Sequence, residues 1–323
     1  MLEFKNVSKR YNQQTVLDTI CLTVKEGEFF VLVGPSGSGK TTTLKMINRL
    51  IDPSEGDIYL HKKELMTYNL KELRLSIGYV LQQIALFPNL TVQENIELIP
   101  ELKKWPKVKR EKRVRELLTL VNLEPDKYLK RKPSELSGGE QQRVGILRAI
   151  AAKPDVILMD EPFSALDPIA RQQLQELIKE IHHEIKSTIV FVTHDMKEAL
   201  ELGDRICIMR NGKIVQIDTP DMIQQHPEND FVAEFFKQEQ SQGGVDFLGL
   251  TVADVLVKSQ NPIIHQEETV SVSPELPLVE LIELIQRHQI VSVVVDHQLV
   301  GTISNDDLLH FLQVELKEVT VNG

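Results

Sequence analysis

Residues 29–42 read Phe29-Phe-Val-Leu-Val-Gly34-Pro-Ser-Gly-Ser-Gly-Lys40-Thr-Thr42, and this stretch decides the fold. Its first five residues are apolar and predict a buried strand. The rest fits the pattern G-x-x-x-x-G-K-[ST], which predicts a tight loop leading into a helix. Phosphate groups need backbone N–H donors close by, and Gly37 and Gly39 allow that approach because neither carries a Cβ. The stretch therefore predicts a loop that binds the phosphates of a nucleotide.

The side chains of this loop predict ATP and Mg²⁺ as ligands. Lys40 can reach the β- and γ-phosphates, and Thr41 can ligate Mg²⁺. The helix that follows offers the positive end of its dipole. A fortuitous glycine-rich turn would lack this order of elements. We expect the nucleotide to contact Gly34, Ser36, Gly37, Ser38, Gly39, Lys40, Thr41 and Thr42.

Further along the chain, strands alternate with helices. Apolar runs bounded by turn residues predict buried strands at 156–159, 188–192 and 206–209. One face of a helix is predicted by the spacing of Leu174, Leu177, Ile178, Ile181 and Ile185. Asn211-Gly212 is a hairpin signal and predicts an antiparallel strand at the edge of the sheet. The predicted fold class is therefore α/β, with a mainly parallel sheet covered on both faces.

The strand at 156–159 leads into two adjacent carboxylates. We expect Asp160 to hold Mg²⁺ through water, and Glu161 can polarise the attacking water. Such a pair at the end of a strand can also cap a helix or form a salt bridge. Its place after a phosphate-binding loop favours the catalytic interpretation.

Length and composition limit the number of domains, the prospect of membrane-spanning segments and the roles of the cysteines. The chain has 323 residues, of which 41% are hydrophobic, so we expect two domains and a packed core. We expect no secretory leader, and no stretch approaches the roughly 18 consecutive apolar residues of a membrane helix. Cys21 and Cys207 have neither disulfide-framework nor metal-ligand spacing. Both are expected to be small core residues in a reducing compartment.

Negative charge is concentrated towards the C-terminus. The net charge is −10, and residues 241–323 hold 12 Asp and Glu against 3 Lys and Arg. The stretch 238–244 (QEQSQGG) lacks large apolar residues, which is typical of a linker. We therefore predict four segments, namely an ATPase domain at 1–237, a linker at 238–249, a small domain at 250–316 and a tail at 317–323.

A third motif indicates which family of nucleotide-hydrolysing proteins the chain resembles. Residues 136–143 read LSGGEQQR, which resembles the signature motif of ABC ATPases. Physically it is a second helix N-terminus with glycines, suited to binding an anion. The resemblance implies that Ser137, Gly138 and Gly139 contact the γ-phosphate of an ATP held by the opposite subunit. It also implies a head-to-tail pair of such chains with two ATP molecules at the interface.

Two further stretches match ABC ATPase motifs in the order of the family. Gln82 resembles the glutamine that senses Mg²⁺ and the γ-phosphate and faces the membrane partner, although Gln83 lies one step away. Residues 164–167 (SALD) resemble the loop that communicates across the dimer, and Asp167 belongs to it. By this resemblance, Gln82 joins Thr41 and Asp160 as a candidate Mg²⁺ ligand.

Two ring side chains complete the series. His194, in FVTHD, resembles the switch histidine, which can donate a hydrogen bond to the γ-phosphate, although a lone histidine after a strand is more often structural. Tyr11 resembles the aromatic residue that stacks on adenine, with an exposed tyrosine in a turn as the alternative. Because Glu161 and His194 are both present, we predict ATP hydrolysis by Glu161, His194 and Gln82 rather than ATP binding alone.

The resemblance extends to one group of importers. Residues 45–57 and 77–88 look like the ATPases of quaternary-amine importers, which take up osmoprotectants such as glycine betaine, carnitine and choline. It covers residues 1–240 and departs at Leu147, where alanine is usual. It implies integral-membrane permease subunits, an extracytoplasmic substrate-binding protein as an indirect partner, and a peripheral position at the cytoplasmic face of the membrane. The alternatives are an importer ATPase for another solute, such as an amino acid, and a nucleotide-responsive regulator.

A basic run at 103–115 (KKWPKVKREKRVR) raises the question of nucleic acid. It holds one aromatic residue, Trp105, and continues into a helical pattern, so a solvated helix face is the favoured interpretation. Contact with anionic lipid is a third option, and we expect no nucleic-acid partner.

The acidic C-terminal region resembles a CBS repeat. Residues 269–312 predict a strand, a helix, two further strands and a short helix, with Leu278, Leu281, Ile282 and Ile285 on one helix face. The resemblance implies that Ser304 and Asp307 contact the ribose of an adenine nucleotide, or a cyclic dinucleotide. CBS repeats normally work in pairs and one full copy fits here, so we hypothesise pairing between two subunits. A dimerisation tail without a ligand is the alternative.

Overall fold

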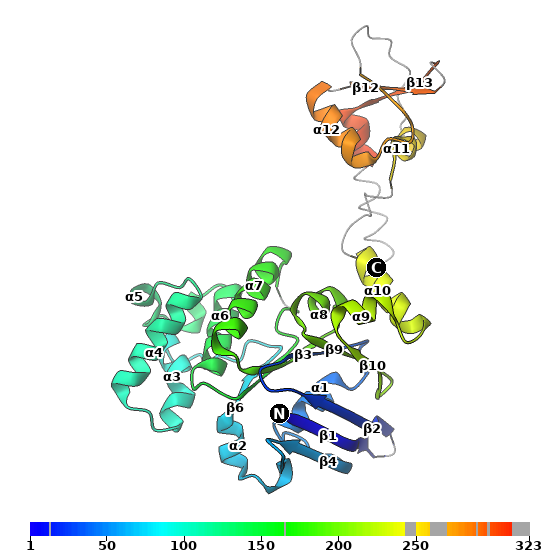
Figure 1. Cartoon of the computed structure of the whole chain (residues 1–323). Helices are drawn as coiled ribbons and strands as arrows, with labels where there is room; N and C mark the ends of the chain where they lie inside the picture. Colours follow the sequence, from blue (N-terminus) through cyan, green and yellow to red (C-terminus); the bar gives the residue numbers. More distant parts are fainter. Residues whose placement is uncertain are drawn as a thin grey trace. The chain divides into compact units, whose positions relative to one another are not determined.

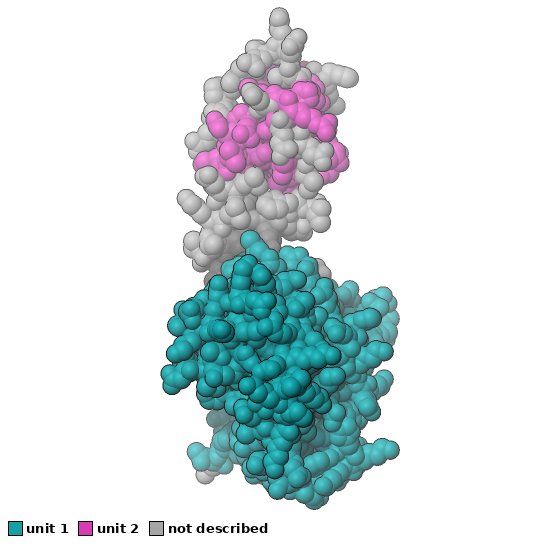
Figure 2. Space-filling view, turned by 90° about the vertical axis from the view of Figure 1, so that its left-hand side faces the viewer, with its two compact units in different colours: residues 1–236 teal, residues 237–323 magenta. Residues whose placement is uncertain are grey.

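The computed structural model describes residues 1–12, 14–164, 166–242, 250–258, 270–288, 290–295 and 298–311. The chain divides into two compact units, Met1–Phe236 and Lys237–Gly323 (Figure 2). The tail predicted at 317–323 lies outside the described residues. In the described part of the chain, no helix is both long and apolar enough to cross a membrane.

A six-stranded sheet forms the centre of the first unit (Figure 1). In the order β10-β9-β3-β8-β7-β6 its strands are Lys213–Asp218, Arg205–Arg210, Phe29–Val33, Thr188–Thr193, Val156–Asp160 and Ile77–Val80. All neighbours are parallel except β9 and β10. Asn211 and Gly212 both have positive φ, 50° and 76°, as a two-residue hairpin turn requires. The four predicted strands and the edge hairpin are confirmed.

Apolar side chains cover both faces of this sheet, because successive residues of a strand point to opposite sides. On β3, Val31 packs into one core cluster with α6 (Gly138–Ile150) and α7 (Pro168–Ile185). Phe30 and Leu32 pack into a second cluster with α1 (Lys40–Ile47). Leu147 on α6 is fully buried, and the predicted apolar face of α7 faces the first cluster.

A four-stranded antiparallel sheet covers the second cluster. Its strands were not predicted from the sequence. In the order β2-β1-β4-β5 it contains Gln14–Val24, Leu2–Tyr11, Glu55–Leu60 and Lys63–Glu64. One prediction about it is wrong, because Cys21 is exposed. Cys21 lies between the buried Ile20 and Leu22 on β2 and therefore points to the opposite face, where its Sγ lies 3.2 Å from Asn6 Oδ1. Cys207 is buried as predicted, and burial raises its pKa to about 12.

A group of helices lies to one side of the first unit (Figure 1). It comprises α3 (Val92–Leu102), α4 (Lys107–Leu120) and α5 (Pro125–Tyr128). The basic run forms the start of α4, whose Lys107, Lys109 and Lys112 are exposed. Arg110 instead turns inward, with Nε 3.1 Å from Glu97 Oε2 on α3. Further helices of the unit are α2 (Leu70–Ser76), α8 (Met196–Leu202) and α9 (Pro220–Gln225), with short 3-10 turns at Leu65–Thr67 and Pro133–Glu135. Helix α10 (Asp230–Gln242) begins in this unit and continues past its last residue, Phe236.

The second unit contains the predicted pattern of strands and helices. Its elements are α11 (Val252–Lys258), β11 (Val270–Val272), α12 (Leu278–His288), β12 (Ile290–Val295), β13 (Gln298–Ser304) and a helix at 305–311. β11 and β12 are parallel, and β12 and β13 are antiparallel. The predicted linker differs in one respect, because α10 continues to Gln242 and residues 238–242 are therefore helical.

Candidate functional site

The phosphate-binding loop joins β3 to α1 in a shape that requires glycine at two positions. Gly34 has φ +151°, and an added Cβ would lie 2.1 Å from the carbonyl oxygen of Met209. Gly39 has φ +102°, and its Cβ would lie 2.4 Å from Leu17 Cδ2. Gly37, with φ +79°, faces open space. The first two glycines thus let the loop pack against neighbouring strands, whereas Gly37 leaves room beside the loop.

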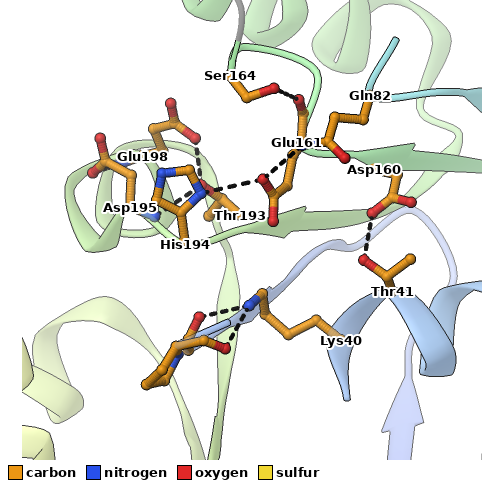
Figure 3. Close-up of polar contacts among 12 residues, drawn as sticks. Lys40, Thr41, Gln82, Asp160, Glu161, Ser164, Thr193, His194, Asp195 and Glu198 are labelled. Atoms are coloured by element: carbon orange, nitrogen blue, oxygen red, sulfur yellow. Dashed lines mark hydrogen bonds and ion pairs between the residues drawn. The ribbon is translucent and has the colours of Figure 1, made fainter. Parts of the chain in front are cut away.

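Lys40 lies inside this loop rather than in solvent. Its Nζ donates hydrogen bonds to the carbonyl oxygens of Gly34, at 2.6 Å, and Pro35, at 3.0 Å (Figure 3). Its exposed fraction is 5%, and burial lowers the pKa of its ammonium group. A buried cation is stabilised by a nearby anion. The loop therefore suits a group that brings negative charge.

Ser38 provides an independent test of whether phosphate fits the loop. Its side chain is 2% exposed, and its Oγ has no hydrogen-bond partner among the described residues. A buried hydroxyl without a partner is costly. A phosphate oxygen would accept its proton, so the residues present fit a phosphate group. Ser36, two residues earlier in the loop, is exposed, and Thr42, in the first turn of α1, is half-buried.

Asp160 and Thr41 bring two oxygen atoms together at the end of β7. Thr41 Oγ1 donates a 2.9 Å hydrogen bond to Asp160 Oδ1 (Figure 3). Asp160 is 6% exposed, and burial raises the pKa of its carboxyl group. Mg²⁺ prefers such hydroxyl and carboxylate oxygens, and its charge would offset the cost of burying the carboxylate. The donor set therefore fits Mg²⁺.

Glu161 is the meeting point of the other two predicted catalytic side chains. Its Oε2 lies 3.2 Å from His194 Nδ1 and accepts a hydrogen bond of 3.3 Å from Gln82 Nε2 (Figure 3). Of the two adjacent glutamines, Gln82 is thus the one that contacts Glu161. Glu161 has an unusual φ of +43°, and its backbone N–H donates to the carbonyl oxygen of Val192 at 3.0 Å. The backbone therefore holds the carboxylate where β7 and β8 end.

The signature residues and Asp167 lie at the N-termini of two other helices. Ser137 caps α6, accepting a 3.3 Å hydrogen bond from the Glu140 N–H. Asp167 caps α7 through the N–H groups of Ile169, at 3.1 Å, and Ala170, at 3.0 Å. Within the described residues, no hydrogen bond joins Ser137, Gly138, Gly139 or Asp167 to the Glu161 cluster. The structure of one chain therefore does not bring them into the same site.

The signature glycines are not required by the packing of the chain itself. An added Cβ on Gly138 would meet no atom within 4 Å, and one on Gly139 would meet only Ala170 Cβ at 4.0 Å. Neither glycine has the positive φ that excludes other residues. The absence of side chains at Gly138 and Gly139 leaves the N-terminus of α6 accessible to a group from outside the chain.

The two remaining predicted contacts are Tyr11 and the pair Ser304 and Asp307. Tyr11 ends β1 and is 45% exposed, with Lys9 Nζ 4.9 Å from its ring centroid. In the second unit, Ser304 and Asp307 bond each other at the start of the helix at 305–311. The Ser304 N–H donates to Asp307 Oδ2 at 2.9 Å, and the Asp307 N–H donates to Ser304 Oγ at 3.2 Å. This reciprocal pair is a capping arrangement that satisfies two backbone donors.

Sequence reasoning missed two charged residues beside the catalytic cluster. Arg171 and Glu198 line one small pocket together with Glu161, Ser164, Thr193 and His194. The available signal was the position of Glu198, four residues after His194 and thus within the first turn of the helix that follows. That position alone is equally consistent with a helix cap.

Known protein families match both units of the chain. A model of the ABC transporter family matches residues 17–164, and a CBS domain model matches residues 257–314. The chain is 48% identical to the glycine betaine/carnitine/choline transport ATP-binding protein of Bacillus subtilis (strain 168), over 92% of this chain and 76% of that protein. It is 42% identical to the osmoprotectant import ATP-binding protein of Salmonella typhimurium, over 91% of this chain and 76% of that protein.

Among solved structures, the chain resembles the dimeric post-hydrolysis state of an ATP-binding cassette bound to ADP and Pi. The TM-score is 0.61 at 38% identity, covering 68% of this chain and 99% of that one.

Proposed function

Because this chain belongs to the ABC transporter family, among the ATP-binding subunits of osmoprotectant importers, we propose that its ATP hydrolysis drives uptake of quaternary amines. The observation that carries the cargo class is the 48% identity, over 92% of this chain, to a glycine betaine/carnitine/choline transport subunit. An importer of another small solute is the second candidate. A regulator without transport is disfavoured, because the chain matches transport subunits along most of its length.

The loop and its neighbours hold the nucleotide. The loop N–H groups, Ser38 Oγ and Lys40 Nζ bind the β- and γ-phosphates, and the exposed ring of Tyr11 stacks on adenine. Mg²⁺, when bound, neutralises phosphate charge. Thr41, Asp160 and Gln82 are the residues that would hold it.

Hydrolysis is assigned to the cluster around Glu161. Its carboxylate orients the attacking water and accepts a proton from it. His194 contacts Glu161 through Nδ1, which leaves Nε2 free to donate to the γ-phosphate. Gln82 donates to the same carboxylate and so reports the state of the site to the segment that follows β6. His194 and Gln82 thus both contact the carboxylate that activates water, and His194 also faces the γ-phosphate.

A second copy of the chain completes each site. The open glycines of α6 leave the Ser137 N-terminus accessible to the γ-phosphate of an ATP bound by the partner, with Asp167 close to the same interface. The similarity to a dimeric cassette supports this arrangement. The dimer drives integral-membrane permease subunits at the cytoplasmic face, which receive solute from an extracytoplasmic binding protein.

The second unit acts as a regulatory domain at about 250–316, connected through 238–249. Its match to the CBS domain supports binding of an adenine nucleotide or cyclic dinucleotide, with contacts from Ser304 and Asp307. Asp307 is 8% exposed and Ser304 is half-buried, so a ligand would contact Ser304 more readily. Isothermal titration of the full chain with ATP, AMP and cyclic di-AMP tests this role. Binding must persist in the Lys40→Ala variant, because the ATPase site would otherwise account for it.

Uptake by cells tests the proposed function as a whole. Radiolabelled glycine betaine, carnitine and choline are followed in cells with the gene deleted, restored, or restored as Lys40→Ala, at low and high osmolarity. We expect deletion to abolish uptake of at least one solute, and the wild type but not Lys40→Ala to restore it. Unchanged uptake of all three in cells without a redundant transporter would exclude these cargoes and leave the ATPase assignment intact.

A further inference from the structure

A network of polar contacts joins helix α7 to the turn that carries His194. On α7, Arg171 Nη1 lies 3.7 Å from Asp195 Oδ2, and its Nε lies 4.0 Å from Glu198 Oε1. Glu198, on α8, accepts a 2.6 Å hydrogen bond from Thr193 Oγ1. Thr193 Oγ1 in turn accepts from the Asp195 N–H at 3.0 Å. Arg171 on α7 therefore contacts this turn directly at Asp195 and, at 4.0 Å, reaches Glu198, which is hydrogen-bonded to Thr193 on the other side of His194.

Glu198 is unusual because it is a buried acid next to a catalytic cluster. Its exposed fraction is 5%, and burial raises its pKa to about 7. The charged or titratable groups that face it are Asp195 and His194 from the turn and Arg171 from α7. Of these three groups, only Arg171 carries a permanent positive charge. An isolated buried carboxylate is costly, and Arg171 lies where it offsets that cost.

Stability alone does not explain this arrangement. Asp195 already caps α8, accepting from the N–H groups of Lys197 at 2.8 Å and Glu198 at 3.1 Å. The Glu198 side chain is thus not needed as a cap. A buried ion pair contributes little to stability compared with apolar residues of the same size. What the Arg171 contacts do provide is a link between α7 and the turn at His194.

We propose that Arg171 and Glu198 form a positioning pair that sets His194 against Glu161 according to the position of α7. Helix α7 begins directly after the segment 164–167, with Asp167 as its N-cap. A displacement of that segment therefore moves Arg171, and the turn at 193–195 follows through Glu198 and Thr193. Neither residue is among those expected to bind phosphate. The inference rests on the proposed ATP hydrolysis at this site and adds a route by which α7 controls it.

Steady-state ATP hydrolysis by the full chain tests the proposal. We expect Glu198→Gln and Arg171→Met each to lower kcat by roughly tenfold while KM for ATP stays within about twofold, because misplaced catalytic groups slow chemistry without removing phosphate contacts. The two effects on kcat should be less than additive in the double variant, since both changes remove the Arg171–Glu198 contact, although Arg171→Met also removes the contact with Asp195. Arg171→Lys, which keeps the charge, should recover most of the lost kcat. Wild-type turnover should also decrease on acidification below about pH 7, as Glu198 gains a proton, and this part of the decrease should be absent in Glu198→Gln.

The matched control is Glu28→Gln. Glu28 is 6% exposed and pairs with Arg205 at 3.1 Å, but it precedes β3 at the end of the strand opposite the phosphate loop. It should change the melting temperature and leave kcat unchanged.

The proposal is overturned if kcat of the Arg171 and Glu198 variants matches that of the control, if their effects on kcat simply add, or if KM alone rises. Should Glu198→Gln fail to fold, Arg171→Met and Arg171→Lys decide the matter, because the Arg171 side chain is 36% exposed. Wild-type turnover no faster than that of Glu161→Gln would overturn the proposed function itself, whereas normal wild-type turnover with unaffected variants overturns this inference alone.

Discussion

Thr41 Oγ1 donates a 2.9 Å hydrogen bond to Asp160 Oδ1, and this bond joins the first turn after the phosphate loop to the end of β7. The two residues are far apart in sequence, and both are candidate Mg²⁺ ligands. Burial raises the pKa of Asp160, so its ionised form is disfavoured in the folded state. The site therefore holds a carboxylate whose burial is offset fully only when a cation is present.

Asp160→Asn should consequently raise the stability of the nucleotide-free protein and abolish its function. A raised folded-state pKa means that the native state holds the proton to higher pH, so this carboxylate lowers stability as pH rises above its usual range. The gain from the substitution should thus be present at pH 8 and absent at pH 4. ATPase activity with Mg²⁺ should fall by at least ~100-fold. Thermal unfolding at the two pH values, without nucleotide, measures the first effect. An equal change in melting temperature at both would contradict it.

Glu161→Gln should separate ATP binding from hydrolysis. The amide keeps a hydrogen-bonding partner for His194 Nδ1 and Gln82 Nε2 but cannot accept a proton from water. We expect turnover to fall by ~100-fold or more and an ATP-dependent dimer to persist on size-exclusion chromatography. Asp155→Asn, an exposed carboxylate at the other end of the same strand, serves as the control. Undiminished turnover in Glu161→Gln would remove Glu161 as the base.

The sequence predicted best the parts of the fold that are specified locally. Strand, loop and helix follow one another at 29–47, and their residue types are imposed by close approach of the backbone, as at Gly34 and Gly39. The antiparallel sheet was harder to predict, because β1 does not alternate regularly. Its register with β2 shifts between Phe4 and Val7, and Asn6 between them has a φ of 51°.

Contacts between residues outside the recognised motifs could not be predicted from the sequence. Arg171 and Glu198 lie on different helices, and nothing in either helical pattern indicates that the other is nearby. The exposure of Cys21 was missed for a related reason. Its neighbours are apolar, but the face to which it points depends on which side of β2 the core lies.

Ser38→Ala should weaken ATP binding without loss of stability. The hydroxyl is buried and has no partner among the described residues, so removing it deletes an unsatisfied group rather than a hydrogen bond. We expect an unchanged or higher melting temperature and a roughly tenfold higher Kd for ATP. Ser36→Ala, at an exposed position of the same loop, should have a smaller effect on Kd. If Ser38→Ala lowered the melting temperature and left Kd unchanged, the hydroxyl would be a structural group.

Gly138→Val and Gly34→Val should fail for different reasons. At Gly138 an added Cβ meets no atom of another part of the chain within 4 Å, so the monomer should keep its melting temperature to within a few degrees while ATP-dependent dimerisation and turnover are lost. At Gly34 a Cβ would overlap the Met209 carbonyl oxygen at 2.1 Å, so the fold itself should be destabilised. Thermal unfolding and size-exclusion chromatography with ATP distinguish the two. A dimer that forms normally in Gly138→Val would argue against a partner nucleotide at this helix.

Glu198→Gln should make the protein more stable at alkaline pH even as it slows hydrolysis. Burial raises the pKa of Glu198 from 4.5 to about 7, so the native state binds more protons than the unfolded state between these values. Stability from this group is therefore fully present below pH 4.5 and is lost as pH rises to about 7. The amide can still accept the hydrogen bond from Thr193, and it should recover about 2–3 kcal/mol at pH 8 and little at pH 4. Urea unfolding at both pH values measures the difference, with Glu28→Gln as the control that should destabilise, because it leaves Arg205 without its partner. Equal destabilisation by the two substitutions would mean that Glu198 is held in the fold as a stabilising ion pair rather than at a cost to stability.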